Sequence, residues 1–381
     1  MNVVHPPLPT DPLVEEVDRF DRAHRLERRA AELDRAPAFP VEIYRAMGAA
    51  GLLGLTVPVS LGGRGVPTAR AAVALFHLAY RSGTTFAKLS LQPEFSSVLG
   101  EHGAPDLVEA WYRPMLRGER LVANHVTEPG AGADVGRLTA RAERTGNGYR
   151  LTGVKSEAAF AVDAEAAIVY ARTGPESGTA GLTAFLVDQR SPGVHREVSP
   201  VDLGERWMRR GVVRYDGVEV PAAHRLGDEG AGFRLVRREL VRERGLLAAI
   251  YLGVAWAAWD RTVDDVARRE AFGGPLANHE DVAFRLVDDY AGLRASWLLT
   301  RDALEAFDRG ERADALTALA KTEATRVALR TLDDAVQFHG GRGYSSELPF
   351  ERWWRDVRSG SIAHGPSEVL RLIVARSIWK G

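Results

Sequence analysis

The stretch HVTEPGAGADV, residues 125–135, lies where the sequence changes from helical to strand-like patterns. It predicts a strand that runs into a glycine-rich turn. Glycines in such a turn let a ligand approach the backbone closely, and their N–H groups can face an anion or a ring carbonyl. An ordinary tight turn is the alternative. The stretch is not a dinucleotide-binding fingerprint, because Val135 stands where that motif needs glycine.

On both sides of this stretch the sequence predicts helices. Residues 12–121 show mostly helical spacing of apolar positions, with Asp11 as a plausible N-cap. Short β-rich stretches fill the middle, and long helices return from about residue 232. Strands between two runs of helices argue against a doubly wound parallel sheet. We therefore predict an α+β fold with three domains: helical residues 1–121, a β domain at 122–231 and a helical bundle at 232–381.

Composition excludes several classes of protein. The formal net charge of -1 argues against a general electrostatic footprint for nucleic acid or an anionic membrane. The absence of cysteine excludes disulfides, thiolate metal sites and a cysteine nucleophile, and we expect no metal site. The first twenty residues lack a signal-peptide pattern, and no apolar stretch reaches the length of a membrane span. We expect a cytoplasmic protein.

A candidate acid–base group lies in RRELVRERG, residues 237–245. Glu239 and Glu243 are four residues apart and share one helix face. Flanking arginines make an exposed ion-pair face the simple interpretation. However, a strongly apolar stretch follows at residues 245–256, so Glu243 falls where the helix becomes buried. A partly desolvated carboxylate has a raised pKa and can act as a base near neutral pH.

Two motifs near the ends of helices could bind a phosphate-bearing ligand. In RREAFGGPL, residues 268–276, Arg269 could pair with a phosphate and Phe272 could lie on an aromatic ring. In QFHGGRGY, residues 337–344, a glycine-rich turn could offer N–H groups to a pyrophosphate. A solvated arginine, a core phenylalanine and a glycine C-cap are the alternatives.

Taken together, these motifs resemble the acyl-CoA dehydrogenase family over nearly the whole chain. GLLGLTVPVSLGGRG, TEPGAGADV, RREAFGGPL, AVQFHGGRGYSSELPFERWWRD and GPSEVLRLIVAR occur in the family's order and spacing. The resemblance implies N-terminal helices, a middle β domain and a C-terminal four-helix bundle. It also implies FAD, a homodimer or a tetramer built from dimers, and an electron-transferring flavoprotein as the electron acceptor. The implied reaction is α,β-dehydrogenation of an acyl thioester.

The resemblance also assigns expected roles to residues of this chain. Residues expected at the flavin ring, or at the family's flavin-facing positions, are Val126, Thr127, Gly132, Ala133, Glu157 and Ala159. Residues expected at the FAD of a neighbouring subunit are Arg269, Phe272, Gln337 and Gly341, while Glu368 matches a polar residue near the adenosine half. Residues expected at the substrate are Arg244, Ala363 and Gly365.

The sequence departs from the family at the catalytic triplet. Many members carry YEG before the last helix, where this chain has Ala363-His364-Gly365. Glu243 instead matches the position used by members that resemble isovaleryl-CoA dehydrogenase, so we expect it to be the catalytic base. Ala363 in place of tyrosine should widen the acyl pocket. His364 has three interpretations: a pocket wall that hydrogen-bonds substrate, an acid–base partner or the base itself, or a residue without a functional role.

A second departure lies at the flavin loop. Glu157 and Ala159 replace an aromatic residue and a Thr or Ser, so either flavin binding is altered or Phe160 supplies the aromatic face. We therefore expect FAD-dependent dehydrogenation of a branched, polar or biosynthetic acyl group, carried on CoA or on an acyl carrier protein. A flavin monooxygenase or a non-redox enzyme that uses His364 is the alternative. A flavin-free scaffold is a third hypothesis.

Overall fold

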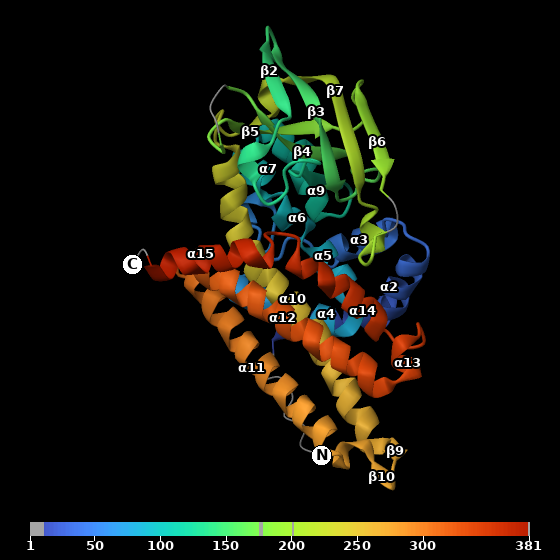
Figure 1. Cartoon of the computed structure of the whole chain (residues 1–381). Helices are drawn as coiled ribbons and strands as arrows, with labels where there is room; N and C mark the ends of the chain where they lie inside the picture. The colour runs from blue at the N-terminus through green and yellow to red at the C-terminus, as the bar shows by residue number, and fades with distance from the viewer. Residues whose placement is uncertain (1–10, 175–177, 200–201, 380–381) are drawn as a thin grey trace.

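The computed structural model describes residues 11–174, 178–199 and 202–379. Its large sheet lies at the upper end of the molecule in Figure 1, and two helical regions pack together below it. Helices come first, the sheet lies in the middle of the chain, and long helices end it. The predicted α+β architecture is confirmed.

In the first region, α1, α2 and α5 pack against α4. Asp11 caps the first helix as predicted, since its carboxylate accepts a hydrogen bond from the backbone N–H of Leu13 at 2.9 Å. Most residues of α4 are buried, which fits a helix enclosed by others. The helices are α1 Pro12–His24, α2 Leu26–Arg35, α3 Val41–Ala49, α4 Thr68–Ser82, α5 Thr84–Ser90, α6 Gln92–Phe95, α7 Ser97–His102, α8 Pro105–Leu107 and α9 Arg113–Leu116.

The sheet has the order β6-β7-β3-β2-β4-β5-β8, with β1 paired in parallel to β4. Most other pairs are antiparallel, and β3 pairs with β7 through two register shifts, the second between Lys155 and Ala158. Such irregularities bend a strand and redirect its side chains. The strands are β1 Val122–His125, β2 Arg141–Thr145, β3 Gly148–Ala158, β4 Ala166–Arg172, β5 Leu182–Asp188, β6 Val194–Val198, β7 Gly211–Pro221 and β8 Arg225–Leu226.

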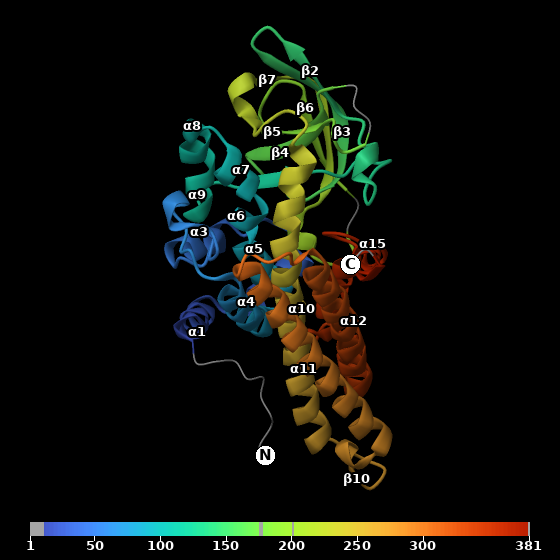
Figure 2. The same cartoon turned by 90° about the vertical axis from the view of Figure 1, so that its left-hand side faces the viewer.

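The third region is organised by α10 (Gly232–Arg268), a helix of 37 residues that runs from the sheet to the far end of the molecule (Figure 2). Its middle is buried on all sides by α4, α11 and α12. A Cβ at Gly253 would lie 2.2 Å from the carbonyl oxygen of Phe76, so glycine lets α4 and α10 touch. The other elements are β9 Glu270–Ala271, β10 Gly274–Pro275, α11 Glu280–Asp308, α12 Asp314–His339, α13 Gly341–Tyr344, α14 Phe350–Arg358 and α15 Ser367–Trp379.

The two helical regions are joined directly as well as through the core. Asp308, the last residue of α11, accepts hydrogen bonds from the backbone N–H groups of Thr68 at 2.8 Å and Ala69 at 2.9 Å. These are two of the free donors at the start of α4. A carboxylate at a helix N-terminus is also favoured by the helix dipole.

Candidate active site

Glu243 and His364 meet in the interior, although 120 residues of chain lie between them. Glu243 is 3% exposed on α10, and its Oε2 lies 3.0 Å from Nδ1 of His364. The His364 ring is also 5.0 Å from the ring of Phe95. Because Glu239 is buried as well, the interpretation of an exposed ion-pair face is wrong. The structure thus brings together the two residues that sequence analysis proposed as catalytic.

Hydrogen bonds from two basic side chains hold the backbone of the loop that carries His364. His364 has a φ of 53°, an uncommon conformation that its surroundings must hold in place. Lys321 on α12 is fully buried and donates hydrogen bonds to the carbonyl oxygens of Ala363 and, at 2.9 Å, Gly365. Arg244 donates from Nε to the carbonyl oxygen of His364 at 3.3 Å. Sequence analysis missed Lys321, and it assigned Arg244 to the substrate rather than to this loop.

Lys321 should make stability depend on pH. Burial, followed by repulsion from Arg244 and Lys88, lowers its pKa from 10.5 to about 7. Between pH 7 and 10.5 the unfolded chain binds this proton and the folded chain does not, so the free energy of unfolding rises with pH. We expect wild type to gain stability over Lys321→Met between pH 7.5 and 9.5, by up to about 1.4 kcal/mol per pH unit. Urea unfolding of both proteins measures the difference, and a difference that does not change with pH would contradict the assignment.

Glu239 lies one helical turn before Glu243 and faces a different partner. Its Oε1 accepts hydrogen bonds from the hydroxyl of Ser97 at 2.8 Å and from the backbone N–H of Val98. Burial, and then the charge of Glu243, raise the pKa of Glu239 well above its usual value. The two carboxylates therefore share one helix face but have separate environments.

The glycine-rich turn of residues 125–135 is fixed by a buried ion pair. Lys155 and Glu128 are 0% and 4% exposed in their side chains, with 2.9 Å between Nζ and Oε1. Lys155 also donates to the carbonyl oxygen of Val126 at 2.9 Å. The backbone N–H of Ser156 donates to the carbonyl oxygen of Thr127 at 2.9 Å. These contacts hold the backbone of Val126 and Thr127 against β3.

One side of this turn is open to a ligand. A Cβ at Gly130 would meet no atom within 4 Å, and one at Gly132 would reach only Thr127, at 3.8 Å. Ala133 is exposed. A backbone that is fixed on one side and open on the other suits the flat ring of a cofactor, so these residues fit FAD.

Glu157 and Phe160, two residues of the flavin loop, have contrasting surroundings. Glu157 has a φ of 53°, is exposed, and has its Oε2 3.5 Å from Nη1 of Arg210, which offsets its charge. The suggestion that Phe160 supplies an aromatic face is not supported. Its ring is buried, with centroids 5.6 Å from Phe39 and 5.5 Å from Trp207.

The residues expected at a neighbour's FAD gather at the other end of α10. Arg269 donates from Nη1 to the carbonyl oxygen of Phe338 at 2.9 Å, which places it beside the turn that contains Gln337 and Gly341. Phe272 projects from the β9–β10 hairpin and is 96% exposed. Helical rise puts Arg269 about 39 Å from Glu243 along α10. The structure thus places the two sets of cofactor residues far apart within one chain, and Glu368 in the first turn of α15.

The described residues contain neither a membrane-spanning helix nor a metal-binding cluster of side chains. Among residues 11–174, 178–199 and 202–379, no helix is both long and apolar enough to cross a membrane. The same part of the chain contains no group of three or more His, Asp or Glu side chains arranged to hold a metal ion.

Family models, related sequences and solved structures all point to the same protein family. Models of the N-terminal, middle and C-terminal domains of acyl-CoA dehydrogenases match residues 11–119, 123–218 and 230–379. Benzylmalonyl-CoA dehydrogenase of Aromatoleum aromaticum is 34% identical over 93% of this chain and 94% of its own length. Subunit CarC of the caffeyl-CoA reductase–Etf complex of Acetobacterium woodii is 31% identical over 92% of each chain. Acyl-CoA dehydrogenase from Geobacillus kaustophilus superposes with a TM-score of 0.89 at 25% identity, covering 96% of this chain and 98% of that one. The chain belongs to the acyl-CoA dehydrogenase family of FAD-dependent oxidoreductases that act on CH–CH groups.

Proposed function

We propose that Glu243 is the base in an FAD-dependent α,β-dehydrogenation of an acyl thioester. The observation that carries this proposal is the buried Glu243 carboxylate in contact with His364. A carboxylate that is held in place beside a bound substrate can act as a general base for the α proton. The YEG position of the family holds His364 here, so no second carboxylate competes at that place.

In this proposal, Glu243 accepts the proton and three other residues position it. His364 Nδ1 holds Oε2 of Glu243, so Oε1 is the oxygen that can receive the α proton. Lys321 and Arg244 hold the loop that positions His364. Bound FAD supplies the acceptor for the β hydrogen, which leaves as hydride.

We propose that FAD is held by residues from two places. Val126, Thr127, Gly132, Ala133, Glu157 and Ala159 would face the ring, and Glu368 would face the adenosine half. Arg269, Phe272, Gln337 and Gly341 would bind the FAD of a neighbouring subunit. Support for a homodimer or tetramer comes from the nearly complete exposure of Phe272 and Tyr344 at the far end of the molecule.

The acyl group is proposed to be bulky, branched or polar. Ala363 leaves room where the family usually has tyrosine, and Phe95 offers an aromatic wall beside His364. Related enzymes are named for benzylmalonyl-CoA and caffeyl-CoA, both with aromatic acyl groups. We propose a CoA or acyl-carrier-protein thioester as substrate. An electron-transferring flavoprotein is the proposed electron acceptor, because one relative works in a complex with such a partner.

Anaerobic bleaching of the flavin absorbance tests this proposal. The purified holoenzyme would be mixed with aryl-substituted, branched and straight-chain acyl-CoA esters, and with the same acyl groups on a carrier protein. We expect an aryl or branched ester to bleach the flavin fastest. Fastest bleaching by butyryl-CoA would contradict the proposed acyl class, and absence of bleaching by every ester would contradict dehydrogenation.

A second candidate function, monooxygenase or non-redox chemistry, rests on His364, whose side chain is 29% exposed and touches Glu243. Under the main proposal, His364→Ala removes one hydrogen bond to the carboxylate and slows bleaching by about tenfold to a hundredfold. His195→Ala, an exposed histidine on β6, is the control and should have no effect. Oxygen consumption that requires an added flavin reductase and disappears in His364→Ala would instead favour the monooxygenase.

A further inference from the structure

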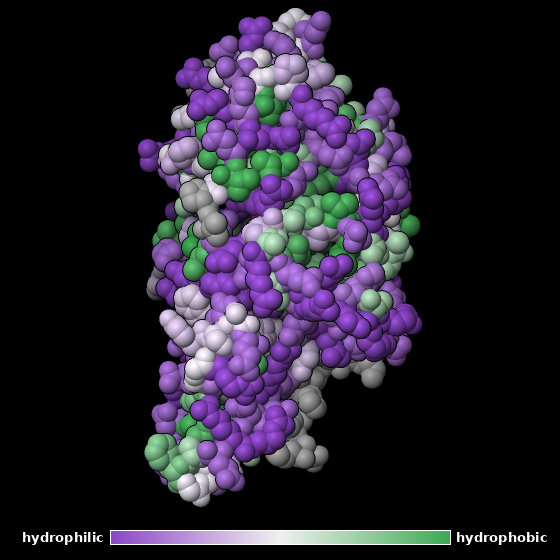
Figure 3. Space-filling model, turned by 90° about the vertical axis from the view of Figure 1, so that its right-hand side faces the viewer, coloured by the Kyte–Doolittle hydropathy of each residue, from purple (hydrophilic) through white to green (hydrophobic). Residues whose placement is uncertain are grey.

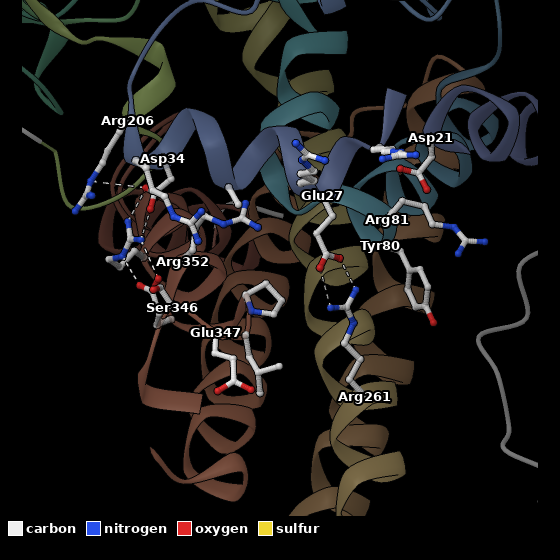
Figure 4. Close-up of a pocket in the computed structure, with 18 residues that line it drawn as sticks. Asp21, Glu27, Asp34, Tyr80, Arg81, Arg206, Arg261, Ser346, Glu347 and Arg352 are labelled. Carbon is white, nitrogen blue, oxygen red and sulfur yellow. Dashed lines mark hydrogen bonds and ion pairs between the residues drawn. The ribbon is translucent and has the colours of Figure 1, made fainter. Parts of the chain in front are cut away.

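A cavity of about 780 Å³ lies outside the site described above. Its walls come from α1 and α2, the end of α4, the turn at Arg206, the last third of α10 and the start of α14 (Figure 4). The face of the molecule that carries α2 and α14 is mainly hydrophilic (Figure 3). Arg261, which lines the cavity, is 18 residues beyond Glu243 on α10, or about 27 Å along the helix axis. The cavity is therefore separate from the proposed catalytic pair.

The lining of this cavity carries an excess of positive charge. Eight arginines and five carboxylates line it, which leaves three positive charges in excess. Most of the carboxylates already have basic partners. Asp34 Oδ2 is 2.7 Å from Nη2 of Arg355, and Glu27 forms a two-pronged pair with Arg261.

Arg352 supplies a buried donor without a hydrogen-bond partner among the described residues, although its charge also acts on Asp34 and Asp356. It is 4% exposed, and the donor atom is Nη1. A buried donor without an acceptor costs free energy, so such atoms are rare in folded proteins. Figure 4 shows the Arg352 side chain between the group around Asp34 and the pair of Glu27 with Arg261.

Two further arginines stand at the rim. Arg25 and Arg35 are exposed, line the cavity, and form no ion pair with a carboxylate among the described residues. Their guanidinium groups are free to turn toward a ligand. Planar guanidinium groups bind phosphate oxygens through pairs of parallel hydrogen bonds.

We propose that this cavity binds a small organic polyphosphate of nucleotide size. A volume of 780 Å³ lies within the range of small-molecule sites. The charge excess and the buried Arg352 call for an anion with adjacent negative groups. The apolar and aromatic side chains of Leu348, Pro349 and Tyr80 in the same lining offer contact for the rest of the ligand. This inference does not depend on the proposed catalytic roles.

Isothermal titration of the FAD-loaded enzyme with ADP, inorganic pyrophosphate and adenosine tests the inference. Loading with FAD fills the cofactor site, so ADP cannot be measured there. We expect saturable binding of ADP and pyrophosphate and none of adenosine. Arg25→Gln and Arg35→Gln should each weaken ADP binding about tenfold, since each removes charge-assisted hydrogen bonds. Arg22→Gln, an exposed arginine on α1 outside the lining, is the matched control and should bind ADP like wild type.

Several outcomes would overturn the inference. Adenosine binding as tight as that of ADP would show that the phosphates are not recognised. ADP binding that is unchanged in both Arg25→Gln and Arg35→Gln would place the ligand elsewhere, such as at the proposed CoA site. Binding of pyrophosphate alone would exclude a ligand of nucleotide size, and absence of binding by either anion would exclude the site.

Discussion

Replacing Glu243 with glutamine is expected to slow substrate-dependent flavin bleaching by about 10²- to 10⁴-fold, the usual contribution of a general base. Glutamine keeps the shape of the side chain, and its amide oxygen can still accept a hydrogen bond from His364. Only the capacity to take up the α proton is lost. Stopped-flow measurement of bleaching under anaerobic conditions gives the rate directly.

Glu239→Gln is the matched control for this experiment. It lies one turn earlier on the same helix, is equally buried, and its Oε1 is held by Ser97 and Val98 rather than by His364. Its bleaching rate should stay within a few-fold of wild type. Both variants should bind FAD in a ratio of one per chain. Full activity in Glu243→Gln would show that another group removes the proton, and His364 would then be the candidate to replace.

Lys155→Met is expected to lower the free energy of unfolding by about 3–5 kcal/mol, because removal of one partner leaves a buried charge unpaired. Glu128 would lose its partner at 2.9 Å and keep only the hydrogen bonds from Thr139 and Ala140. The carbonyl oxygen of Val126 would lose its donor at the same time. Urea unfolding of wild type and variant measures the change.

An exposed ion pair in the same sheet supplies the control. Arg150 on β3 and Glu219 on β7 are 2.9 Å apart, but their side chains are 57% and 61% exposed. Arg150→Met should therefore change the free energy of unfolding by no more than about 1 kcal/mol. Equal effects of the two substitutions would show that the turn does not depend on the buried pair.

Much of the architecture follows from local patterns in the sequence. Helical spacing and the Asp11 cap indicate where the first helix begins, and its hydrogen bond to Leu13 is present. The switch to short β-rich stretches indicates the sheet. Glu243 could be selected because the apolar stretch after it implies burial, and the burial is observed. The limits of the three domains and the roles of the site residues stay predictions.

What the sequence did not reveal are contacts between distant segments. The hydrogen bonds of Lys321 to the loop at residues 363–365, and of Glu239 to Ser97, depend on helix packing that no local pattern encodes. The scarcity of lysine in the sequence is one pattern that could have indicated some of these contacts. The chain has only four lysines, and the three that the structure describes, Lys88, Lys155 and Lys321, are all buried. Since lysine is almost never buried without a partner, such scarcity could have marked each of them as structural.

The single helix α10 limits how this protein can change during evolution. It carries Glu243 and Arg261 on one uninterrupted helix, and Arg269 follows directly as its C-cap. Each residue of an α-helix turns the chain by about 100°. Loss or gain of one residue between Glu243 and Arg269 would therefore swing the β9–β10 hairpin around the helix axis and away from any subunit that it contacts. Sequences of this lineage should thus differ by substitution along α10 but keep its length, while the surface loops of the sheet are free to lengthen or shorten.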